Sequence, residues 1–238
     1  MAGTFIRGAL VEFMPTFLIP LPNIIIFQFN PETMTHSWTQ PASVPVSQGA
    51  GGNANPLAVR GVPGESFSFT LVMDTVDMIA DGSPVAEGLA TVSGVYSRLA
   101  ALEMLQYPVP AADSGLVGSV TAAAGAVAGG AAGATPDRSV PAMQVPTVLF
   151  VWGPGRIVPV RVTSLSITEK LYDALLNPIH AEATIGLRVL TPDELAYVTG
   201  PLADVARISY KYSQGLREVL AIANLANAAE SVIGMLPF

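Results

Sequence analysis

The stretch that most constrains the fold is Pro146–Leu190, which opens near the apolar run VLFVW. A run so short and so rich in β-branched and aromatic residues is typical of a strand covered on both faces. Gly153-Pro154-Gly155 supplies a turn, because glycine permits positive φ and proline fixes φ. Alternating apolar residues predict further strands over 158–167 and 181–189. The stretch therefore predicts a three-stranded antiparallel meander, with a bulge near Thr163-Ser164 where the apolar positions change parity.

The first half of the chain predicts fewer elements. Residues 1–22 contain three prolines after position 14 and read as an arm that pairs or packs late. Residues 23–29 predict a strand, with 34–38 as its hairpin partner. Strict alternation over 66–74 predicts a strand with phenylalanine, leucine and methionine on its inner face, and 84–106 has the apolar spacing of one amphipathic helix.

Two segments depart from this pattern. Residues 108–145 are rich in Ala, Gly and Pro and read as a low-complexity insertion. From Thr191 the period becomes helical: a capping box precedes a short helix, and a longer helix follows from Leu202, with Gly215 as the place where it would divide. We expect one β domain over 1–190 and a C-terminal helical extension over 191–238.

Composition points to association with other subunits. Half of the residues are hydrophobic and only 12% are charged, against about 25% charged residues in typical globular proteins. The most apolar candidate for a membrane span, 117–134, is too rich in glycine to insert well. The sequence therefore favours burial against neighbouring subunits, without direct insertion into a membrane.

Charge and chemistry exclude several functions. The net charge of −7 and the absence of a Lys/Arg cluster argue against nucleic acid as a partner. No cysteine is present, so thiolate metal sites and disulfides are excluded, which fits assembly in a reducing cytoplasm. Neither His36 nor His180 has an Asp or Glu near it at the spacing of metal ligands, and a metal site needs three or four ligands. The sequence also contains no motif of a catalytic nucleophile. We therefore expect neither an enzyme nor a cofactor or metal site.

Two separated motifs carry a family resemblance. The W-G turn, the strand ending in SLSITEKLYD, the Asn-Pro loop and HAEATIGLRVL resemble the C-terminal half of tube and baseplate proteins of contractile injection systems, which are phage-tail-like particles. The stretch FQFNPE at 27–32 is similar to the family's F-x-F-N-P opening. The matches cover roughly 30 to 190. The LysM module that family members often carry has no candidate here.

The resemblance implies an α+β, mainly β fold in which two small antiparallel sheets with a helix form a tail-tube-like β-barrel unit, followed by C-terminal helices. It implies a structural baseplate or tube-initiator protein, assembled in the bacterial cytoplasm, whose hexameric ring joins the inner tube to the spike in a released or membrane-anchored particle. Its partners would be the inner-tube protein, the spike protein and other baseplate proteins. The alternatives are an inner-tube subunit of the same particle or a carbohydrate-binding β-sandwich of a tail apparatus. The residues expected at interfaces are Phe29, Asn30, Pro31, Trp38, Trp152, Leu216, Val219, Ile222, Leu225 and Ile233.

Overall fold

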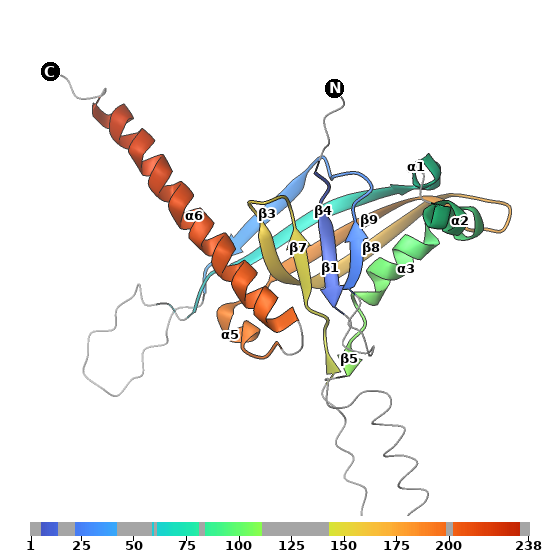
Figure 1. The fold of residues 1–238 in the computed structure, drawn as a ribbon, viewed down its shortest axis with the longest axis horizontal. Helices are drawn as coiled ribbons and strands as arrows, with labels where there is room; N and C mark the ends of the chain where they lie inside the picture. The colour runs from blue at the N-terminus through green and yellow to red at the C-terminus, as the bar shows by residue number, and fades with distance from the viewer. Residues whose placement is uncertain are drawn as a thin grey trace, which may run out of the picture.

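The computed structural model describes residues 6–13, 22–41, 59, 61–80, 84–110, 143–198 and 202–233. Over these residues the fold is α+β and mainly β, with one seven-stranded antiparallel sheet, a two-stranded ribbon and five helices (Figure 1). The strands are β1 (Ala9–Phe13), β2 (Pro22–Ile26), β3 (Met34–Thr39), β4 (Gly64–Asp74), β5 (Val109–Pro110), β6 (Met143–Gln144), β7 (Val148–Val151), β8 (Ile157–Tyr172) and β9 (Pro178–Val189). The helices are α1 (Thr75–Ala80), α2 (Pro84–Ser93), α3 (Tyr96–Met104), α5 (Pro192–Leu195) and α6 (Leu202–Ile233).

The expectation of two small sheets closed into a barrel is wrong. The strand order of the large sheet is β2-β1-β7-β8-β9-β4-β3, so β2 and β3 are its two edges. The two halves of the chain merge because β1 pairs with β7 and β4 pairs with β9. Pairing between the halves thus produces one continuous open sheet rather than two separate ones.

The meander predicted for β7, β8 and β9 is confirmed, and so is the bulge. The register of β8 against β9 shifts between Val162 and Ser164. The opening run is deeply buried, with Val148 and Phe150 fully inaccessible. Gly186 lies opposite the bulge, and a Cβ atom there would lie 2.4 Å from the Ser164 hydroxyl. The bulge and this glycine therefore require each other.

The N-terminal segment does pair, because β1 is an interior strand of the sheet between β2 and β7. The hairpin expected of residues 23–29 and 34–38 is wrong, because β2 pairs with β1 rather than with β3. β3 pairs instead with β4, at the opposite edge of the sheet. The chain does not turn back at Asn30, because the side chain of Asn30 bonds to the backbone of Ile6 and Gly8.

One core joins the inner face of the sheet to the helices. Alternate residues of β4, β9, β8 and β7 pack with Leu99 and Leu102 of α3. The helix predicted over 84–106 is divided into α2 and α3, because Gly94 has a φ of +57° and the next amide, Val95 N–H, bonds to the Pro178 carbonyl at 2.9 Å. The low-complexity segment has its ends paired as β5 and β6, whereas 111–142 lie outside the described residues.

The C-terminal helices begin as predicted. Thr191 and Glu194 form the capping box of α5. α6 is one continuous helix of 32 residues, so Gly215 does not divide it. Its first half packs on β8, whereas its second half extends past the sheet (Figure 1). Of the described helices, α6 protrudes farthest from the sheet (Figure 1).

Candidate interaction surfaces

α6 is fixed to the sheet by an ion pair between Arg217 and Glu65. Glu65 lies at the start of β4 and is 6% exposed. Its Oε2 accepts a hydrogen bond from Arg217 Nη1 at 2.8 Å, while Nη2 binds Oε1. His36 Nε2 lies 2.7 Å from the same Oε1. Because a buried carboxylate is costly unless it is paired, this cluster holds β3, β4 and α6 together.

The imidazole of His36 is enclosed by aromatic rings. Its centroid lies 4.2 Å from that of Phe67 and 3.7 Å from that of Trp38. Burial lowers the pKa of His36 below its ordinary value of 6.5, although Glu65 opposes that shift. The histidine is thus a partly buried partner of a carboxylate, a relationship that its sequence neighbours did not indicate.

Trp38 lines a groove between the sheet edge and α6. The groove has a volume of about 480 Å³ and is also lined by Tyr210, Gln214, Arg217 and Glu218 of the helix. Trp38 is 56% exposed. The structure therefore brings Trp38 next to the middle of α6, where Leu216 is partly buried.

The residues of the F-x-F-N-P motif have separate tasks. Phe27 is buried in the core. Asn30 accepts a hydrogen bond from Gly8 N–H and donates one to the Ile6 carbonyl, both at 2.9 Å. Phe29 is exposed and, with Pro31, lines a second groove of about 660 Å³ on the outer side of β4. The motif thus ties the N-terminal segment to the sheet and presents an aromatic ring to solvent.

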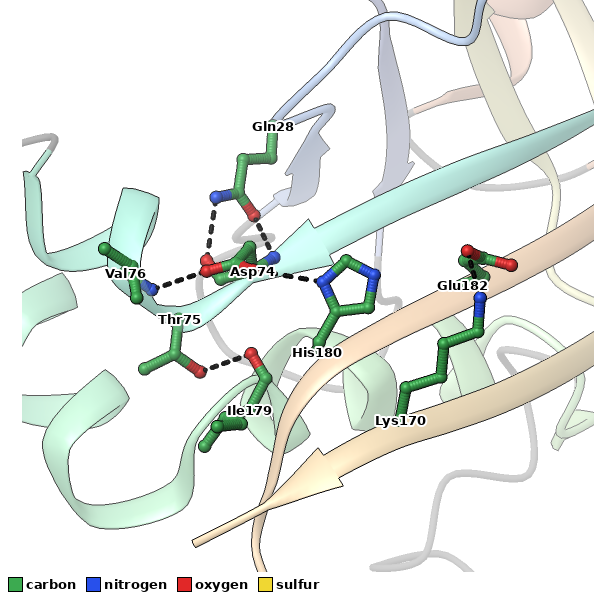
Figure 2. A network of polar contacts seen from close by, with 8 residues as sticks. All are labelled: Gln28, Asp74, Thr75, Val76, Lys170, Ile179, His180 and Glu182. Carbon is green, nitrogen blue, oxygen red and sulfur yellow. Dashed lines mark hydrogen bonds and ion pairs between the residues drawn. The ribbon is translucent and has the colours of Figure 1, made fainter.

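A polar network fixes the end of β4, where α1 begins (Figure 2). The side-chain amide of Gln28 bonds to both backbone groups of Asp74, at 2.8 and 3.0 Å. Asp74 Oδ2 lies 3.0 Å from His180 Nδ1, and this hydrogen bond lowers the pKa of Asp74 below its usual value. Asp74 Oδ1 accepts a hydrogen bond from Val76 N–H.

Most bonds of this network join side chains to backbone groups. The Thr75 hydroxyl donates to the Ile179 carbonyl at 3.0 Å and so is engaged with the backbone (Figure 2). Among the described residues, no hydroxyl hydrogen-bonds to His180, as a nucleophile would need to do. No three His, Asp or Glu side chains gather as metal ligands within the described part of the chain.

The β8–β9 hairpin ends in an exposed apolar tip. Leu175 and Leu176 are 79% and 78% exposed, and Leu171 and Tyr172 beside them are also exposed. The tip is held in shape because Asp173 Oδ1 accepts hydrogen bonds from the backbone N–H groups of Leu175 and Asn177. A fixed loop that points leucines at solvent is suited to contact another surface.

The outer face of the sheet is rich in hydroxyl groups. Ser166 of β8, Thr184 of β9 and Thr70 of β4 stand side by side in register, and the two threonine hydroxyls lie 3.0 Å apart. Lys170–Glu182 and Asp74–His180 are ion pairs between neighbouring strands on this face, and Arg188 of β9 pairs there with Glu194 of α5. Further hydroxyl residues of this face on β3, β4 and β8 include Thr35, Ser37, Thr39, Ser66, Ser68, Thr163, Ser164 and Thr168.

The predicted interface residues do not form one patch. Phe29, Asn30 and Pro31 lie at the outer groove, whereas Trp38 lies at the α6 groove. Trp152 is partly buried and packs against the core, with its ring centroid 6.1 Å from that of Phe150. On α6, the side chains of Val219, Ile222 and Leu225 are exposed, and Ile233 has its side chain outside the described ones.

Sequence reasoning missed two features. The adjacent pair Leu175-Leu176, in a loop that also contains Asp and Asn-Pro, was a visible signal because leucines are uncommon in such loops. The pair between Arg217 and Glu65 had no signal, because 152 positions separate its members.

No known family model matches the sequence, and no curated protein matches it. None of the described helices combines the length and the apolarity that are needed to cross a membrane.

Proposed function

We propose that the chain is a structural baseplate protein of a contractile injection particle, a tube initiator whose copies form a ring between the inner tube and the spike. The observation that supports this most is the position of the uncovered apolar side chains. They gather at the hairpin tip, on the edge strand β2 and along the extending half of α6. Such patches at the ends of protruding elements are expected of a subunit that completes its burial on neighbours.

The two edges of the sheet provide the ring contact. Both β2 and β3 have one side without a strand partner among the described residues. Ile24 and Ile26 of β2 are 52% and 53% exposed. Pairing of β2 in one copy with β3 of the next is a heterologous contact, and repetition of such a contact closes a ring when the rotation permits. Six copies is the number that the family resemblance implies.

The outer face of the sheet would line the channel of this ring. Its rows of serine and threonine hydroxyls bind water well and carry little charge. A face of this kind stays hydrated without attracting a polypeptide of one sign of charge. This assignment leaves the apolar tip and α6 free to contact proteins above and below the ring.

The inner-tube subunit of the same particle is the alternative. A tube repeats its ring many times, so every copy would have to accommodate an extending helix at every level. A terminal ring has to accommodate it only once. The extension of α6 past the sheet therefore favours the initiator over the repeated subunit (Figure 1).

Electron microscopy of the purified full chain, together with light scattering, tests the proposal. We expect rings that bind the inner-tube and spike proteins of the same particle. Leu175→Ser with Leu176→Ser should keep the melting temperature and reduce binding to the partner proteins, because the tip makes few contacts with its own core. Tyr197→Ser is the matched control, since Tyr197 is 77% exposed and lies outside the hairpin. A stable monomer that binds neither partner would contradict the proposal.

A further inference from the structure

An apolar stripe runs along α6, and its residues are separated alternately by three and four positions. Between Val205 and Ile222 its members are Val205, Ile208, Tyr212, Gly215, Val219 and Ile222. This average spacing of 3.5 residues keeps a stripe facing one partner helix, as in a coiled coil. We call these six residues the α6 seam.

The seam is not the side of α6 that packs on its own sheet. That side consists of small buried residues, including Ala206, Ser209 and Ser213, and the Ser213 hydroxyl bonds to the Ile157 carbonyl at 2.7 Å. On the seam, by contrast, Ile208 is 67% exposed and Val219 is 63% exposed. α6 therefore has one side that is covered by its own subunit and one that is largely exposed, where the Tyr212 hydroxyl donates a hydrogen bond to the Pro154 carbonyl of the same subunit at 3.0 Å.

The sizes of the seam residues favour one orientation of a partner helix. Gly215 faces open space, because a Cβ atom added there would meet nothing within 4 Å. Tyr212, the preceding seam residue, is large and half exposed. In a parallel pair of α6 helices, Tyr212 would meet Tyr212 and Gly215 would meet Gly215, which crowds one layer and empties the next. In an antiparallel pair, each Tyr212 fills the space over Gly215 of the other helix.

The same antiparallel register fills the neighbouring layers. With residue 212 opposite 215, Ile208 lies opposite Val219, and Val205 lies opposite Ile222. Each of these layers combines two β-branched side chains of similar size, and none contains a charge. In the middle layer a large residue lies opposite a small one, and in the layers on either side residues of similar size lie opposite each other. This arrangement packs without voids.

The charges that border the seam agree with this register. Lys211 and Glu218 are exposed, and neither forms an ion pair with another described residue. In the antiparallel pair, Lys211 of one copy lies near Glu218 of the other, and the symmetry repeats the contact. Exposed pairs of this kind add little affinity but favour one orientation over another.

We propose that α6 pairs in antiparallel orientation with α6 of a second copy, about a two-fold axis beside residues 213 and 214. A two-fold contact uses the same patch on both copies and cannot close a ring. It therefore uses different residues from the ring contact proposed above, and either contact can exist without the other.

Single cysteines test the register, because the natural chain contains none. Full-length Ile208→Cys and Val219→Cys should form a disulfide when the two variants are mixed under mild oxidation, and neither should do so alone. In the antiparallel pair, residue 208 of one helix is 11 positions from residue 208 of the other, or about 16 Å along the axis. A disulfide needs Cα atoms within about 7 Å. Ala221→Cys, exposed and off the seam, mixed with Ile208→Cys is the matched control.

A second variant tests the hollow over Gly215. Gly215→Leu should fold as well as the natural chain, since a Cβ atom added there meets nothing within 4 Å and leucine favours a helix. It should slow the 208–219 cross-link by about tenfold or more, because the space for Tyr212 is filled. Cross-linking of Ile208→Cys alone at the rate of the mixture, no cross-link in the mixture, or an unchanged rate with Gly215→Leu would each overturn the proposal. Rings without the cross-link would leave the proposed function intact.

Discussion

Arg217 reaches from α6 to Glu65 on β4 and joins, by two hydrogen bonds, residues that are 152 positions apart. Glu65 is almost fully buried, and its other close partner is His36 of β3. One carboxylate therefore determines how the helix, the edge strand and its neighbour fit together.

Arg217→Ala should destabilise the protein. Among the described residues, the substitution leaves the buried Glu65 with His36 as its side-chain hydrogen-bond partner and Arg156 as a nearby positive charge. We expect this to lower the free energy of unfolding by about 1–3 kcal/mol. Urea unfolding at pH 7 measures the change. Arg207→Ala is the control: Arg207 pairs with the exposed Asp204, and such pairs contribute at most about 1 kcal/mol. Equal decreases in the free energy of unfolding of the two variants would mean that the contact with Glu65 contributes no more than an exposed ion pair.

His36 should make stability depend on pH. Burial lowers the pKa of His36 in the folded state, so the unfolded chain binds more protons as the pH falls below its ordinary value of 6.5. The contribution of His36 is therefore fully present above pH 6.5 and declines as the pH falls through the folded pKa. In His36→Gln, the curve of unfolding free energy against pH should be flatter between about pH 5 and 7. If acidification stabilised the natural chain relative to this variant, the effect of His36 on the unfolding free energy would have the opposite sign to the one predicted.

Gly94 should tolerate no side chain, whereas Gly88 should. Gly94 has a φ of +57°, and a Cβ atom there would lie 2.2 Å from the Pro178 carbonyl oxygen. We expect Gly94→Ala to cost about 2 kcal/mol or more, since both the backbone and the contact are strained. Gly88 lies within α2, where a Cβ atom meets nothing within 4 Å. Gly88→Ala should stabilise the protein by about 0.5–1 kcal/mol. Thermal unfolding that ranks the two variants in reverse would contradict this account.

Truncation should separate the two halves of α6. A chain ended after Gly200 loses Ser213 and Arg217, which bond to the sheet, and should melt at a much lower temperature or fail to fold. A chain ended after Leu220 keeps the described side-chain hydrogen bonds of the helix to the β strands and their turns, and it should melt within a few degrees of the full chain. Circular dichroism on heating compares the three chains. If the chain ended after Leu220 failed to fold, the end of α6 would belong to the subunit's own core.

The sequence predicted those features that depend on near neighbours in the chain. The β7–β9 meander, the bulge at Val162–Ser164 and the capping box at Thr191 each follow from spacing within a few residues. The union of the two halves through β1 and β4 was missed, because strand partners far apart in the sequence leave no local pattern. The break at Gly94 was missed for the same reason, since the carbonyl that crowds it belongs to Pro178.

The candidate surfaces show the same division. The exposure of Val219, Ile222 and Leu225 agrees with their prediction as interface residues, but the partner remains a proposal. Trp152, a predicted interface residue, is partly buried and packs on the core, where Phe27 and Phe150 approach it. An aromatic residue in a strand does not reveal from its own segment which face will be covered.

Because α6 is continuous, a small tilt at its base moves its far end by a larger distance. Arg217 is the last described residue with a side-chain bond from α6 to the sheet, and the helix continues for 16 residues to Ile233. At 1.5 Å per residue, that is a stiff arm of about 24 Å, so a tilt of about 10° at its base displaces its tip by about 4 Å. A small rearrangement around Glu65 would therefore be amplified into a large displacement at a distant surface.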